Sequence, residues 1–233
     1  MKKFILASLL LIVALNGAAQ TQIQNSGWLT LINNTKFNEK WGVALDLQVR
    51  SADNWSYVRN ILIRPGITYY FNGSTNATAG YLYAPTRTQT PTGDFTLLEQ
   101  RIWEQLAYSH KIKSSFATHR VRLEQRFIET NGGGDIFAQR FRYFFRLIKP
   151  LQDYKETFDK GIFVALQNEL FFNIQSKDQL NKSLFDQNRF YIAAGYRVSK
   201  KLDIEAGYLN QYINGATTNT SNRVAQFAIY TRF

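Results

Sequence analysis

The sequence of 233 residues contains no cysteine and only two histidines. The absence of cysteine excludes a disulfide scaffold and a lipid-modified lipoprotein. His110 and His119 stand near a predicted turn, so no cluster has the spacing of a metal site and no cofactor is expected. Ser109, Ser114 and Ser115 lie close to the histidines, but serine is an ordinary turn residue. An enzyme such as a hydrolase is therefore the least favoured reading of the chain.

The chain also lacks, after its first residues, any hydrophobic run that approaches the ~20 residues of a transmembrane helix. Its longest apolar stretch, residues 4–15, follows two lysines and precedes small residues that end at Ala19. This arrangement predicts a secretory signal peptide over residues 1–19, cleaved after Ala19, rather than a membrane anchor. The mature domain is predicted to span residues 20–233.

Proline is scarce, with four residues, whereas aromatic residues reach 15% of the chain and the mean hydropathy is −0.30. Membrane β-barrels combine these properties because one face of each strand meets lipid and the other meets a polar interior. The formal net charge of +11 is also typical of nucleic-acid binders. However, most lysines fall in predicted turns and most arginines in predicted strands, and this separation argues against a nucleic-acid partner.

Alternating apolar and polar residues mark eleven strand-like segments. They cover residues 27–37, 41–51, 57–71, 75–85, 96–110, 115–130, 136–148, 161–174, 187–198, 201–213 and 222–233. Strands of about 9–11 residues are long enough to cross a bilayer at a tilt. Because bacterial barrels of one chain close with an even number of antiparallel strands, we predict a single antiparallel transmembrane β-barrel of twelve strands. Residues 21–25 would add the twelfth, and ten strands remain the alternative.

Segment 97–107 is ambiguous, since Leu98, Ile102 and Leu106 also fit the apolar stripe of a helix. Its neighbours are strands, so a strand is predicted here too. Long polar loops are expected at residues 87–94, 175–186 and 214–221, opposite a set of short turns.

Arginine dominates one face of several predicted strands. In segment 119–128, arginines alternate with Val121 and Leu123, and in segment 137–147 they alternate with aromatic residues. An arginine that faces lipid at mid-depth costs about 2–4 kcal/mol, so these rows should face the interior. The inward arginines are predicted to be Arg50, Arg64, Arg101, Arg120, Arg122, Arg126, Arg140, Arg142, Arg146, Arg189, Arg197 and Arg232, and the inward acids Asp46, Glu99, Glu124, Glu169, Asp203 and Glu205.

A charge network within this interior is predicted to comprise Arg122, Glu124, Arg126, Arg140, Arg142, Arg146, Glu99, Arg101 and Glu169. Glu124 alone cannot neutralise the arginines beside it, so Glu99, Glu169 or a bound anion must contribute. Two readings stay open. The excess of cations favours a pore or pocket for small anions, whereas a structural Arg–Glu network would simply fill a small barrel.

The final segment, residues 222–233, alternates apolar and polar residues and stops on the aromatic Phe233. Such an ending looks like the sorting signal that the barrel-assembly machinery reads in the bacterial outer membrane. The sequence therefore predicts a location in the outer membrane, in contact with its lipid. Aromatic residues near strand ends are predicted to form an interfacial girdle; they are Trp28, Trp41, Tyr69, Tyr70, Tyr83 and Tyr230.

Four features together resemble the domain of unknown function 2490 family of bacterial outer-membrane β-barrels. They are the early Gly27-Trp28 strand followed by Lys40-Trp41, the run Glu99-Gln-Arg-Ile-Trp-Glu-Gln105, the Arg-x-Arg-x-Glu-x-Arg run from Arg120 to Arg126, and the Tyr-Thr-Arg-Phe ending. The resemblance covers the mature chain and implies fold and location. It supplies no established activity and no catalytic residues.

Two functions follow from these expectations. The first is a narrow passive channel for small anionic solutes. The alternative is a plugged barrel with a structural or interaction role and no transport, because the width of the interior depends on strand number and stagger.

Overall fold

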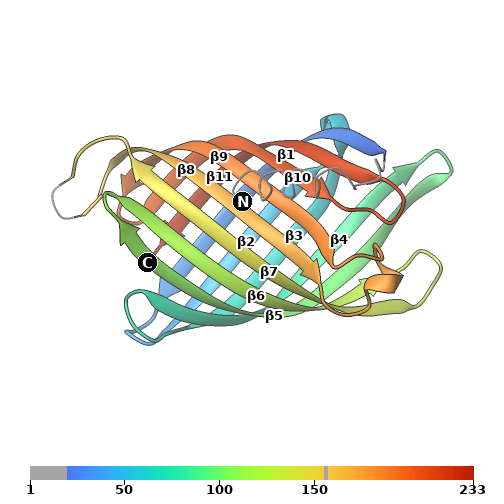
Figure 1. Ribbon diagram of the computed structural model, residues 1–233, viewed down its shortest axis with the longest axis horizontal. Helices are drawn as coiled ribbons and strands as arrows, with labels where there is room; N and C mark the ends of the chain where they lie inside the picture. The colour runs from blue at the N-terminus through green and yellow to red at the C-terminus, as the bar shows by residue number, and fades with distance from the viewer. Residues whose placement is uncertain (1–19, 155–156) are drawn as a thin grey trace, which may run out of the picture.

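The computed structural model describes residues 20–154 and 157–233 of the chain. The predicted signal peptide, residues 1–19, lies outside the described residues. The strands of the described part close into one barrel (Figure 1). They are β1 (Thr21–Lys36), β2 (Trp41–Ser51), β3 (Val58–Tyr70), β4 (Thr75–Thr90), β5 (Gly93–Ile112), β6 (Ser115–Glu129), β7 (Asp135–Pro150), β8 (Gly161–Asn173), β9 (Phe185–Ser199), β10 (Leu202–Ile213) and β11 (Asn219–Arg232), with two short 3-10 turns, η2 (Asp53–Trp55) and η3 (Lys177–Gln179). The prediction of an all-β barrel is confirmed.

The prediction of twelve strands is wrong for the described residues, which form eleven. Residues 21–25 do not form a separate short strand but continue into β1 without a break. Their backbone pairs with the start of β11, from Thr21 opposite Asn219 to Asn25 opposite Arg223. The expectation of an even number of strands therefore fails, because residues 21–25 lengthen β1 instead of forming a strand of their own.

The barrel closes through a parallel pair, β1 against β11, while every other neighbouring pair is antiparallel. An odd number of strands makes the first and last run in the same direction. The expected all-antiparallel closure is therefore corrected at this one seam. As a consequence, Thr21 and Arg232 lie at opposite ends of the barrel.

The two ends differ in their connections. We call one the turn end, where residues 37–40, 71–74, 113–114 and 200–201 connect the strands, and where the chain reaches Phe233 (Figure 1, left). The opposite, loop end carries residues 52–57, 130–134, 174–184 and 214–218. One longer connection, described over residues 151–154 and 157–160, departs from the expected pattern because it lies at the turn end.

Two local expectations can be compared with the strands. Residues 97–107 belong to the long strand β5, so the strand prediction is confirmed and the helical stripe is only the outward face. The loop predicted at residues 87–94 is wrong, because β4 and β5 extend across it to a tight hairpin. The side chain of Arg87 reaches Asp94 across this hairpin, with Nη2 2.5 Å from Oδ2.

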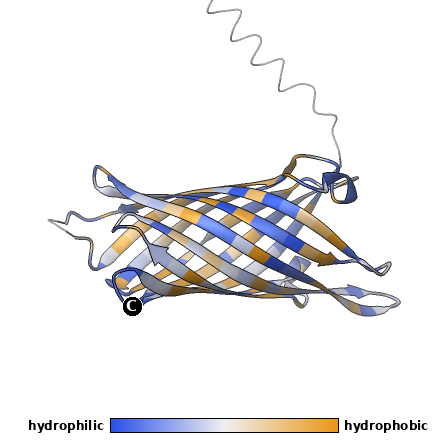
Figure 2. Ribbon diagram, turned by 90° about the horizontal axis from the view of Figure 1, so that it is seen from below, coloured by the Kyte–Doolittle hydropathy of each residue, from blue (hydrophilic) through white to orange (hydrophobic). Residues whose placement is uncertain are grey.

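Each strand presents one apolar outer face and one mixed inner face, so orange and blue segments succeed each other along the ribbons (Figure 2). On β3, Ile61, Ile63 and Ile67 are exposed on the outside, and Ile67 keeps 61% of its surface. Leu62 and Arg64 from the same strand are buried inside. Among the described residues, no helix is long and apolar enough to span a membrane.

Candidate functional site

The interior charges arise from the register of the strands β5, β6 and β7. Arg101 lies opposite Arg126, Arg122 opposite Arg142, and Glu124 opposite Arg140. Residues directly opposite in an antiparallel pair are about 4.5–5.5 Å apart at Cβ, and like charges there repel. Stability therefore requires carboxylates that reach several guanidinium groups at once.

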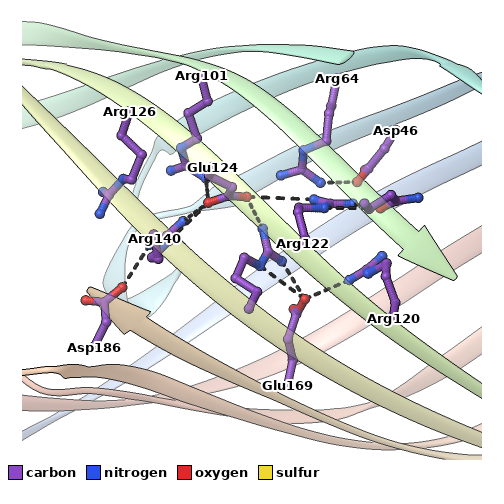
Figure 3. Close-up of polar contacts among 12 residues, drawn as sticks. Asp46, Arg64, Arg101, Arg120, Arg122, Glu124, Arg126, Arg140, Glu169 and Asp186 are labelled. Carbon is purple, nitrogen blue, oxygen red and sulfur yellow. Dashed lines mark hydrogen bonds and ion pairs between the residues drawn. The ribbon is translucent and has the colours of Figure 1, made fainter. Parts of the chain in front are cut away.

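Glu124 is the centre of this arrangement and has 0% of its surface exposed (Figure 3). Oε2 of Glu124 accepts hydrogen bonds from Nη2 and Nε of Arg140 at 2.7 and 3.0 Å, and from Nη1 of Arg101 at 3.4 Å. Oε1 accepts a hydrogen bond from Arg142 and lies 3.8 Å from Nη1 of Arg122. One buried carboxylate thus contacts four guanidinium groups.

Glu169 and Glu99 balance the rest of the predicted stripe. Oε1 of Glu169, on β8, lies 2.7 Å from Nη2 of Arg142 and 2.7 Å from Nη2 of Arg120. Oε1 of Glu99, on β5, lies 2.7 Å from Nε of Arg101 and 2.6 Å from Nε of Arg126. The structure therefore brings the two acids named from the sequence to the arginines that Glu124 cannot neutralise.

Further carboxylates hold the remaining paired arginines. Asp186 lies 2.9 Å from Nη1 of Arg140, although the sequence predicts it in a loop, because β9 begins at Phe185, two residues before the predicted segment. Arg146, the ninth member of the predicted network, forms an ion pair with Glu205 on β10. The other interior pairs are Arg64 with Asp46, and both Arg197 and Arg232 with Asp203.

Two arginines of the interior differ from all of these. Among residues 20–154 and 157–233, no carboxylate oxygen lies within 4.0 Å of the side-chain nitrogens of Arg50 or Arg189. Instead, Arg50 donates to the amide oxygen of Gln48, and Nε of Arg189 donates to Oε1 of Gln187 at 3.3 Å. Neither guanidinium group therefore has a direct counter-ion among the described residues.

Trp28 and Tyr230, predicted in the outer girdle, lie in the interior instead. Trp28 is buried between Ser26 and Thr30 on the inner face of β1, with 4% of its surface exposed. Tyr230 stands beneath the guanidinium of Arg146, whose Cζ is 4.9 Å from the ring centroid. The interior position of both residues is predictable from the sequence. Side chains alternate between the two faces of a strand, and Trp28 and Tyr230 share the parity of the polar residues on their strands.

The other four girdle candidates divide between the two faces. Trp41 and Tyr83 are exposed on the outside, and Trp41 packs edge-on against Tyr69 with ring centroids 5.0 Å apart. Tyr70 faces the interior at the turn end, where it lines a cavity. Phe233 closes the chain there, with its backbone N–H 2.9 Å from the carbonyl oxygen of Asn34.

Three cavities follow one another along the inside of the barrel. The turn-end cavity has a volume of about 540 Å³, the middle cavity about 100 Å³ and the loop-end cavity about 190 Å³. Ile32, Asp46, Arg64, Arg120 and Phe144 line both the first and the second. Trp28 lines both the second and the third. The middle cavity, the smallest of the three, therefore lies between the other two, and we refer to it below as the constriction.

The histidines take no part in this interior. The ring of His119 stacks on that of His110 with centroids 5.3 Å apart, and Nδ1 of His119 is 2.8 Å from the hydroxyl of Tyr143. Within the part of the chain that the structure describes, no group of three or more His, Cys, Asp or Glu side chains is placed to hold a metal ion.

The protein is a closed β-barrel. Arginines and carboxylates fill its interior, with cavities at both ends, so the lumen is its candidate functional site. The chain belongs to the family described as "Protein of unknown function (DUF2490)", whose model matches residues 25–222. The resemblance seen in the sequence motifs is thereby confirmed. No curated protein matches the chain.

One solved structure is similar in fold, described as "NanC porin structure in rhombohedral crystal form". Its TM-score is 0.48 at 11% sequence identity, and the alignment covers 84% of this chain and 92% of that chain.

Proposed function

We propose that this protein is an outer-membrane β-barrel that provides a narrow passage for small anionic solutes. The observation that carries the proposal is the middle cavity. Five arginines line it, Arg64, Arg120, Arg142, Arg146 and Arg189, against two carboxylates, Asp46 and Glu169. A constriction lined by an excess of one charge favours solutes of the opposite sign.

Location in a membrane is supported by the outer face of the barrel. Apolar side chains such as Ile67, Ile192 and Phe227 are exposed on the outside of strands that are far apart in the sequence. A belt of this kind matches lipid, whereas contiguous apolar patches of that extent are rare on soluble monomers. The aromatic Phe233 at the end of β11 is the group that we propose the barrel-assembly machinery recognises.

The volume of the constriction limits what could pass. A water molecule takes up about 30 Å³ in the liquid, so the middle cavity of about 100 Å³ holds only a few. Solutes of a few heavy atoms fit this space, and larger ones would require the arginine side chains to move. The proposal is therefore a channel of low conductance rather than a wide general pore.

A second candidate function, a plugged structural barrel, is favoured by one specific observation. Glu124, Trp103 and Phe171 are 0%, 2% and 0% exposed, so this part of the lumen is packed like a protein core. In that case the ion pairs stabilise the wall and the long loops would meet external partners.

Planar-bilayer recording of the purified barrel separates these two candidates. The channel predicts small single-channel currents and a reversal potential that indicates anion preference in a gradient of potassium chloride. The structural barrel predicts correct insertion, seen as a shift of gel mobility on heating, with no currents above those of the bare bilayer. The second result would exclude the proposed passage.

A further inference from the structure

Most interior arginines of this barrel contact a carboxylate of the chain, whereas two of them have no such contact within the described residues. Arg140 and Arg142, for example, each contact two carboxylates. An external anion at these two would have to compete with the carboxylates of the protein. Arg50 and Arg189, without a carboxylate partner among the described residues, are free of that competition.

The hydrogen bonds of these two arginines leave donors available. Nε and Nη2 of Arg50 both point to one acceptor, the Oε1 atom of Gln48. For Arg189, the described contact is from Nε to Gln187. Because a guanidinium carries five N–H donors in a planar fork, each group retains N–H donors for an oxyanion.

Trp28 holds the two groups near each other. Cζ of Arg50 lies 3.8 Å from the centroid of the Trp28 ring, and Cζ of Arg189 lies 5.3 Å from it. Arg189 also lies 4.7 Å from the ring centroid of Phe171. Stacking on aromatic faces orients a guanidinium while leaving its edge, with the N–H groups, available for hydrogen bonding.

This pair lies where the middle cavity meets the loop-end cavity. Trp28 lines both the middle and the loop-end cavity, Arg189 lines the middle one and Arg50 the loop-end one. A solute that moves between the two cavities would therefore pass Trp28 and meet both Arg50 and Arg189.

We propose that Arg50 and Arg189 form a binding site for a small oxyanion, a carboxylate or phosphate group, at Trp28. Both anions match the planar fork of arginine, which binds two oxygens at once. The site would be the point at which the proposed passage selects its solutes. The role of this site in a passage rests on the proposed function, whereas binding of the anion does not.

Anion binding is measured on the purified, full-length barrel in detergent, without any need for current. The midpoint of thermal unfolding is recorded at increasing sodium acetate in one arm and inorganic phosphate in the other, at constant ionic strength. A ligand that binds the folded state raises the midpoint with its concentration. We expect saturable stabilisation by at least one anion, and the arm that responds identifies the group as carboxylate or phosphate.

The double variant Arg50→Gln and Arg189→Gln should weaken the apparent affinity at least tenfold. The control Arg223→Gln removes one positive charge from an exposed position on β11 and should leave the affinity within twofold of the wild type. Arg50→Glu is a second variant that supplies Arg189 with a carboxylate. It should abolish the response to the anion while keeping the unfolding midpoint of the anion-free barrel at or above that of the wild type.

The proposal is overturned if neither anion stabilises the wild type, or if the double variant responds as the wild type does. Its failure is distinguishable from failure of the passage. Anion-selective currents with an unchanged double variant would remove the site alone, whereas anion binding to a barrel without currents would remove the passage alone.

Discussion

Glu124 and Arg140 lie directly opposite each other on β6 and β7, and the carboxylate accepts two hydrogen bonds from the same guanidinium, at 2.7 and 3.0 Å. With Glu124 fully buried, this pair is the core of a network that reaches Arg101, Arg122 and Arg142. Breaking a buried ion pair leaves an uncompensated charge, so substitutions in this network should lower the stability of the barrel.

Glu124→Gln should destabilise the barrel by about 3–5 kcal/mol, because four guanidinium groups would lose their shared carboxylate. The measurement is unfolding by urea or guanidinium in lipid vesicles. Glu104→Gln is the matched control, one position from Trp103 but on the outer face. It should cause no loss of stability. Equal stability of the Glu124 variant and the wild type would contradict the role given to this carboxylate.

Arg142→Ala should also lower stability, since it leaves both Glu124 and Glu169 with one guanidinium fewer. Because this arginine is neutralised within the wall, its removal should change stability more than anion preference. Thermal midpoints and reversal potentials of the same preparation give both quantities. A stable variant with strongly reduced anion preference would assign the selectivity to this paired stripe instead.

Gly80→Ala should destabilise the barrel by about 1–3 kcal/mol through overpacking. A Cβ atom at Gly80 would lie 2.5 Å from Cζ2 of Trp103, and Gly66 on the neighbouring strand is covered by the same indole. The fluorescence of Trp103 should shift as the ring is displaced. Gly73→Ala, at a position where a Cβ would meet nothing within 4 Å, serves as the control and should be silent.

Ile32→Ala should raise single-channel conductance without changing anion preference. Ile32 lines both the turn-end and the middle cavity, so its truncation widens the constriction and removes no charge. Leu31→Ala alters the adjacent residue on the outer face and should leave the current unchanged. An identical conductance in the Ile32 variant would place the rate-limiting narrowing elsewhere.

Single cysteines can report orientation, because the natural chain has none. Cysteine at Gly132, in the connection between β6 and β7 at the loop end, should react with an impermeant maleimide on intact cells. Cysteine at Gly73, at the turn end, should react only after the outer membrane is opened. These results would place the loop end outside the cell, whereas the reverse result would place the turn end there. Labelling of neither in intact or opened cells would contradict the outer-membrane location.

The inner face of the barrel was predictable from the sequence because alternation is a local property. Arg122, Glu124 and Arg126 share one parity on β6, and a charged row cannot face lipid without a large cost. The ion-pair partners of these residues are harder to predict from the sequence. Arg120 on β6 reaches Glu169 on β8 across the intervening strand β7, a contact that depends on the closure and stagger of the whole barrel.

Two of the wrong predictions rest on general rules, namely an even number of strands and the preference of tryptophan for the membrane interface, rather than on the local pattern of a strand. An even strand number requires residues 21–25 to form a strand of their own, whereas the backbone continues through them into β1. The residue type of Trp28 favours the membrane interface, but its parity with Ser26 and Thr30 places it inside the barrel. The pair Arg50 and Arg189 could not be singled out from sequence, since every inward arginine looks alike until its neighbours are known.

The parallel seam between β1 and β11 also predicts an order of assembly. Each hairpin can form between strands adjacent in the sequence, whereas the seam joins Ser26 to Asn222, whose side chains hydrogen-bond at 2.9 Å across 196 positions. Closing so large a loop has the highest entropic cost of all the strand pairings. We therefore expect the first strand to keep an unpaired edge until the last is in place, so that the cylinder forms by one late closing event.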